Sequence, residues 1–103
     1  MFRVDGNSML PTLKRGEIVL IDPRAEISIG DIVVVHHPYK QSVKLVKRVD
    51  SINSEGRYVL TGDNSTSSTD SRSFGSLAGP DINGKVVCRI ENRFVNEFLA
   101  HRP

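Results

Sequence analysis

The chain has 103 residues, of which 38% are hydrophobic and 25% are charged, and its formal net charge is +2. This length is typical of one domain, and the composition excludes a disordered chain because it supplies enough apolar residues for one modest core. The small charge gives no indication of nucleic-acid binding, and the single cysteine, Cys88, excludes an internal disulfide and a cysteine-rich zinc site. We therefore expect one domain over residues 1–103.

Short apolar runs rich in valine and isoleucine, separated by Gly, Pro, Asp and Asn, predict β-strands. In chain order the expected strands are 18–21, 32–35, 43–52, 58–60 and 84–90. Residues 65–80 are rich in Ser, Thr, Gly and Asp, which predicts a loop, and residues 94–101 have the apolar spacing of a short helix. The fold class that follows is mainly β: a coiled, partly closed antiparallel sheet with a short C-terminal helix.

No segment of the sequence has the length of a membrane span. The longest aliphatic run, Ile32 to Val35, is far shorter than the ~20 residues that a transmembrane helix needs. The charged start of the chain is not followed by the apolar stretch of a signal peptide. We expect a soluble, cytoplasmic protein without a membrane span, and peripheral association with a membrane stays open.

The first candidate for chemistry is Ser8, in the run Gly-Asn-Ser-Met-Leu-Pro-Thr-Leu of residues 6–13. Pro11 restricts the exit of this loop, Gly6 lets the backbone approach other groups closely, and Met9 can anchor the loop in apolar surface. A tightly held loop would aim the hydroxyl, as a nucleophile requires. Considered alone, Ser8 could equally be a turn serine that caps the local backbone, and a serine hydroxyl needs a nearby base to react.

Lys47 is the candidate base. Alternation along residues 43–49 places Lys47 on the same strand face as Val43, Leu45 and Val49. Burial among aliphatic side chains disfavours the ammonium, so the pKa of Lys47 should fall from about 10.4 towards neutrality. The alternative is a strand lysine whose stem covers the core while its amine reaches water.

The polar segment of residues 62–75 supplies a third group of candidates. Asp63, Asp70 and Arg72 can pair with one another and with Arg48, which would hold this segment beside the lysine strand. A hydroxyl such as that of Ser68 could orient the lysine amine, which is the role of the third group in catalytic triads. The alternative is a solvated loop whose surface ion pairs contribute under about 1 kcal/mol each.

Adjacent histidines, His36 and His37, could indicate a metal. Neighbouring strand residues point to opposite faces, and no zinc-type spacing connects this pair with Cys88 or His101. We therefore expect a strand-end pair, no metal and no cofactor. Cys88 is expected to be a core or edge thiol rather than a catalytic one.

Taken together and in this order, the run of residues 6–13, Lys47-Arg48-Val49 and the Gly-Asp-Asn…Asp-Ser-Arg-Ser-Phe-Gly segment of residues 62–75 resemble the type I signal peptidase superfamily. The resemblance covers residues 5–90. It implies that Ser8 is the nucleophile, Lys47 the general base and Ser68 the hydroxyl that orients the lysine. The implied supporting ion-pair residues are Arg48, Asp63, Asp70 and Arg72.

The resemblance also implies that the backbone N–H of Ser8 forms the oxyanion hole. Some bacterial members carry a serine two positions before the nucleophile as a second donor. Gly6 occupies that position here, so this side-chain donor is absent. Losing one such donor corresponds to about 10²-fold in rate unless another group substitutes for it.

The implied activity is that of a serine endopeptidase that removes a short N-terminal pro- or signal segment from an extended protein substrate. Small members without an anchor resemble the maturation proteases of nickel-type superoxide dismutase, so the expected substrate is that superoxide dismutase precursor. Three alternatives stay open: a signal (leader) peptidase core acting on exported proteins, a fragment of a self-cleaving repressor, and an inactive β-rich module that binds peptides.

Overall fold

A computed structural model describes residues 1–40, 42–64 and 75–90. In these residues six strands form one antiparallel sheet, and one 3-10 helix is present. The elements are β1 (Phe2–Arg3), β2 (Ile18–Asp22), β3 (Ile32–His36), β4 (Lys44–Ile52), β5 (Tyr58–Thr61), the 3-10 helix η1 (Gly79–Asp81) and β6 (Ile82–Ile90). The prediction of a mainly β, antiparallel fold is confirmed. The helix predicted over 94–101 lies outside the described residues.

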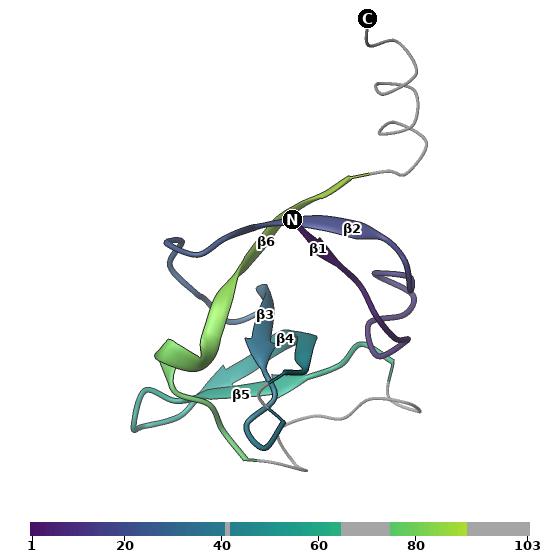
Figure 1. Ribbon diagram of the computed structural model, residues 1–103. Coiled ribbons are helices and arrows are strands. Elements are labelled where there is room, and N and C mark those ends of the chain that lie inside the picture. Colours follow the sequence, from purple (N-terminus) through teal and green to yellow (C-terminus); the bar gives the residue numbers. More distant parts are fainter. Residues whose placement is uncertain (41, 65–74, 91–103) are drawn as a thin grey trace, which may run out of the picture.

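The strand order is β1-β2-β6-β3-β4-β5, so the last strand of the chain is inserted between β2 and β3. Figure 1 shows β6 as a long strand of a strongly coiled sheet, and its pairing with β2 and β3 connects β1 and β2 to the rest of the sheet. β1 and β5 form the two outer positions, and the sheet is not closed into a barrel. No helix of the described segments is long and apolar enough to cross a membrane.

The core consists of two apolar clusters. The first contains Val4, Met9, Leu13, Val19, Val34 and Val46. The second contains Val33, Val35, Val49, Leu60 and Leu77. Consecutive residues of a strand point to opposite faces, so the valines of β3 contribute to both clusters in turn. This two-sided burial explains why β3 is an uninterrupted apolar run.

The prediction of a loop over the whole of residues 65–80 is wrong at its C-terminal end. Leu77 is buried, and its N–H and C=O exchange two hydrogen bonds with Tyr58, of 2.9 and 2.8 Å. A single leucine in a polar segment leaves no apolar pattern in the sequence, yet it can fill the core beside the edge of β5. Cys88 is exposed on β6, not part of the core.

Candidate active site

Ser8 lies in the loop that connects β1 with β2, and buried side chains anchor this loop in the core. The side chains of Met9 and Leu13 are buried in the first apolar cluster, and the Leu13 N–H donates to the Met9 carbonyl at 2.9 Å. Gly6, before the nucleophile candidate, has a φ of +128°, which side-chain-bearing residues rarely adopt. The Leu10–Pro11 peptide bond is cis. Ser8 itself is half-buried between the anchored and exposed parts of this loop.

Lys47 lies in the middle of β4, directly opposite Val33 of β3. Its side chain is 1% exposed, and it is the only charged side chain among the described residues that is buried. Leu45 and Val49, on the same face of β4, pack in or against the second cluster. The predicted burial of Lys47 among aliphatic neighbours is thus confirmed. Lysine side chains are almost never fully buried unless they are paired, so this location is exceptional.

The structure brings the Ser8 loop against β4 beside Lys47. The Ser8 hydroxyl donates a long hydrogen bond of 3.5 Å to the carbonyl of Val46, the residue that precedes Lys47. The hydroxyl is therefore directed at the backbone of the strand that carries Lys47. Ser8 and Lys47, which are far apart in the sequence, thus meet at one place: the Ser8 hydroxyl contacts the residue of β4 that precedes Lys47.

Arg48, the next residue of β4, forms a bidentate pair with Asp63. The bond from Nε to Oδ1 is 2.8 Å and the bond from Nη2 to Oδ2 is 2.7 Å, while Nη1 donates to the Gly30 carbonyl at 2.7 Å. The Thr12 hydroxyl, from the Ser8 loop, also donates to Asp63. The hydrogen bond from Arg48 is the main cause that lowers the pKa of Asp63, and it raises the pKa of Arg48 in turn. This network connects β4, the turn before β3 and the Ser8 loop.

Asn64 holds the Ser8 loop through hydrogen bonds to its backbone. Its backbone N–H donates to the Ser8 carbonyl and its side-chain Nδ2 donates to the Asn7 carbonyl, both at 2.9 Å. No role was predicted for Asn64 or Thr12 from the sequence. Asn64 follows Gly62 and Asp63 in the segment that carries the resemblance, and this position in the motif is the sequence feature that could have indicated its role.

Three predicted site residues, Ser68, Asp70 and Arg72, lie outside the described residues. Their roles as the orienting hydroxyl and as further members of the ion-pair set stay predictions. Of the predicted set, the structure places Ser8, Lys47, Arg48 and Asp63 in one region, and it pairs Arg48 with Asp63.

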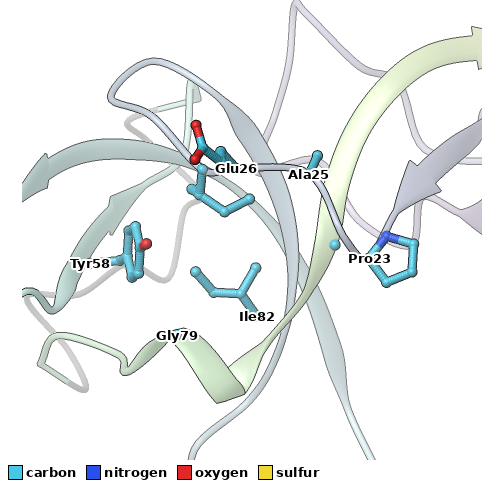
Figure 2. A pocket seen from close by; sticks show the side chains of 8 residues that line it. Pro23, Ala25, Glu26, Tyr58, Gly79 and Ile82 are labelled. Carbon is cyan, nitrogen blue, oxygen red and sulfur yellow. The ribbon is translucent and has the colours of Figure 1, made fainter.

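A separate cavity of about 400 Å³ contains none of the predicted site residues. Figure 2 shows it between the loop that carries Ala25 and Glu26 and the side chains of Tyr58 and Ile82.

The two adjacent histidines have different partners. His36 Nε2 lies 3.1 Å from Asn83 Nδ2, and His37 Nδ1 accepts a hydrogen bond from the Tyr39 N–H at 3.1 Å. Among residues 1–40, 42–64 and 75–90, no group of three or more metal-binding side chains is present.

Comparisons with known proteins point to one protease family. Residues 1–87 match the family described as Peptidase S24-like. The mitochondrial inner membrane protease subunit 1 of Xenopus tropicalis is 32% identical, over 82% of this chain and 65% of that protein. The subunit 1 of Schizosaccharomyces pombe is also 32% identical, over 82% of this chain and 69% of its own length. The mitochondrial ATP-independent inner membrane protease subunit 1a of Arabidopsis thaliana is 29% identical, over 84% and 67%. The chain thus spans about two thirds of the length of these relatives.

Proposed function

Because the chain belongs to the Peptidase S24-like family, we propose that it is a serine peptidase with Ser8 as the nucleophile and Lys47 as the general base. The observation that carries this proposal is the complete burial of Lys47, one residue from the carbonyl that the Ser8 hydroxyl contacts. Unless it is paired, a lysine side chain is almost never fully buried, and burial disfavours its charged form. The nearby hydroxyl gives the buried amine a proton to accept.

The proposed reaction is acyl transfer. Neutral Lys47 takes the proton of the Ser8 hydroxyl while the oxygen attacks the peptide carbonyl, and the Ser8 N–H stabilises the oxyanion. Protonated Lys47 then returns the proton to the leaving amine, and water hydrolyses the acyl-enzyme with Lys47 as base again. For the first step the hydroxyl must turn from the Val46 carbonyl towards Lys47. Catalytic hydrogen bonds in free enzymes are often poorly aligned and tighten when substrate binds.

The relatives favour the leader peptidase alternative over the maturation of superoxide dismutase. Their names describe inner membrane proteases of mitochondria, and they give no support to the superoxide dismutase precursor as substrate. We therefore propose that the chain is the catalytic part of a signal-peptidase-like protease. Its substrate would be the N-terminal segment of a protein directed to or across a membrane, bound in extended form beside the sheet. The same names favour association with a membrane over the purely cytoplasmic location expected from the sequence.

The dyad can be tested with peptides that span the junction between an export signal and the mature protein. Ser8→Ala and Lys47→Met should each lower kcat/KM by at least about 10³-fold, because each removes a member of the reacting pair. Lys47→Met keeps an apolar side chain of similar length, so the fold should persist. Lys44→Met, on an exposed position of the same strand, is the matched control and should keep full activity. Activity within tenfold of the natural protein in Ser8→Ala or Lys47→Met would exclude the dyad.

A further inference from the structure

The peptide unit between Asn7 and Ser8 carries the N–H that the proposed mechanism uses as oxyanion donor. In a trans peptide the C=O and N–H point in opposite directions, and the one cis bond of the described residues is Leu10–Pro11. The direction of the Ser8 N–H is therefore set by whatever holds the Asn7 carbonyl. That carbonyl accepts two hydrogen bonds, from Asn64 Nδ2 at 2.9 Å and from the Leu10 N–H at 3.2 Å.

Within the described residues the Ser8 N–H donates no hydrogen bond, although the carbonyls on both sides of it are engaged. The Ser8 carbonyl accepts from the Asn64 N–H at 2.9 Å, so a single residue binds the two peptide units that flank the nucleophile. An N–H that is held in one direction and is not engaged by these residues is suited to stabilise a developing negative charge.

We infer that Asn64 is a positioning residue for the oxyanion hole: its side-chain amide, bound to the Asn7 carbonyl, aims the Ser8 N–H at the reacting carbonyl oxygen. This inference rests on the proposed function. A hydrogen bond accepted by a peptide carbonyl also polarises the N–H of the same unit, which strengthens it as a donor. By aligning the backbone donor, Asn64 offsets part of the oxyanion stabilisation that is lost because Gly6 has no side-chain donor.

The position of Asn64 is itself coupled to the strand of the general base. Asp63, its neighbour, forms two hydrogen bonds with Arg48, and Arg48 follows Lys47 in β4. The segment after β5 therefore holds both flanking peptides of the nucleophile and the strand of the base. Nucleophile, base and oxyanion donor share one rigid frame through Asp63 and Asn64.

The role is tested by Asn64→Ala, which removes the bond to the Asn7 carbonyl and keeps the backbone bond to Ser8. We expect kcat to fall by about 10- to 100-fold with KM changed less than about threefold, because the donor acts mainly in the transition state. The pH profile of kcat should keep its position because Lys47 is untouched. A peptide aldehyde, which forms a tetrahedral adduct with a serine, should bind weaker by the same factor as the loss in kcat. A product peptide should keep its affinity.

Asn64→Asp provides a second variant of the same size, with an acceptor in place of the donor, and its loss of kcat should be at least as large. Asn53→Ala is the control. The Asn53 side chain also holds local backbone, accepting from the N–H groups of Glu55 and Arg57, but in a turn of another region. It should leave kcat and aldehyde affinity unchanged.

Three results would overturn the inference. One is a kcat of Asn64→Ala within twofold of the natural protein while Ser8→Ala is inactive. A second is an equal loss of affinity for the aldehyde and for the product peptide, which would indicate a merely structural role. Full activity in Ser8→Ala would instead overturn the proposed function, and the role of Asn64 with it.

Discussion

Ser8 and Lys47 are held in place by different means. Lys47 belongs to a strand that is paired on both sides, by β3 and β5, and its side chain is buried on the face of Val33, Leu45 and Val49. Ser8 belongs to a loop that two buried side chains anchor on one side and hydrogen bonds from Asn64 hold on the other. The proposed base is thus placed by packing, and the proposed nucleophile by two buried side chains together with the hydrogen bonds from Asn64, which form a polar clamp. Substitutions in the two regions should therefore separate stability from chemistry.

Met9→Ala removes the buried side chain directly after Ser8, the proposed nucleophile. Met9 is 1% exposed, so the truncation should lower the free energy of unfolding by about 3 kcal/mol through lost burial and a cavity. The loop above the cavity should also shift, and misplacement of a nucleophile should lower kcat/KM by about 10-fold or more, measured well below the melting temperature. Urea unfolding and peptide cleavage give the two numbers.

Leu77→Ala is the matched control in the second cluster. Leu77 is similarly buried, at 2% exposure, but it is bonded to Tyr58 and not to the Ser8 loop. It should lose a comparable free energy of unfolding, with a smaller fall in kcat/KM than Met9→Ala, because the Ser8 loop is untouched. Equal losses of activity in both variants would show that the two regions are not separable.

Asp63→Asn weakens the Arg48–Asp63 ion pair beside the polar clamp. Asp63 accepts two hydrogen bonds from Arg48 and one from Thr12, so its replacement should lower the free energy of unfolding by about 2 kcal/mol. Asp5→Asn is the control, because Asp5 pairs with Arg15 at 3.7 Å where both side chains are largely exposed. That pair should contribute under about 0.5 kcal/mol. Urea unfolding at pH 7 compares the two variants, and a similar loss in both would contradict the importance of the Arg48 pair.

The contribution of Asp63 should depend on pH in a defined direction. The pKa of this carboxyl is lower in the folded chain than its ordinary value of 3.8, chiefly because Arg48 hydrogen-bonds to the charged form. A lowered folded pKa gives stability that is fully present above the unfolded pKa and is lost as the pH falls through the folded pKa. The stability difference between the natural protein and Asp63→Asn should therefore be constant from pH 7 to about pH 5 and shrink below about pH 4. A difference that grew on acidification would contradict this assignment.

Local pattern was sufficient to predict most strands and the burial of Lys47. Runs of β-branched residues between turn residues predict strands, and alternation along residues 43–49 places Lys47 on an apolar face. β1 could not be predicted because two residues carry no pattern. The strand order also was not predictable, because insertion of β6 between β2 and β3 depends on pairings between distant parts of the chain.

The polar contacts of the site were only partly accessible from the sequence. The Arg48–Asp63 pair could be anticipated because opposite charges of one region pair readily, and the resemblance placed both in one set. The contacts of Thr12 with Asp63 and of Asn64 with Asn7 join residues 51 and 57 positions apart. No periodicity or composition encodes such pairs, since they arise only when the segment after β5 meets the Ser8 loop.

The smallest expected effect concerns Gly6, where conformation and space can be told apart. An added Cβ would meet no atom within 4 Å, but φ is +128°, so Gly6→Ala should lower the free energy of unfolding by about 1 kcal/mol through backbone strain alone. Gly79→Ala is the control, since its Cβ would make one ordinary contact at 3.9 Å and its φ lies outside the range that side chains avoid. It should change stability by less than about 0.5 kcal/mol. If the two variants lost the same free energy, backbone strain would not explain the glycine before the nucleophile. A larger loss in Gly6→Ala would mean that a serine there also could not supply an oxyanion donor without strain.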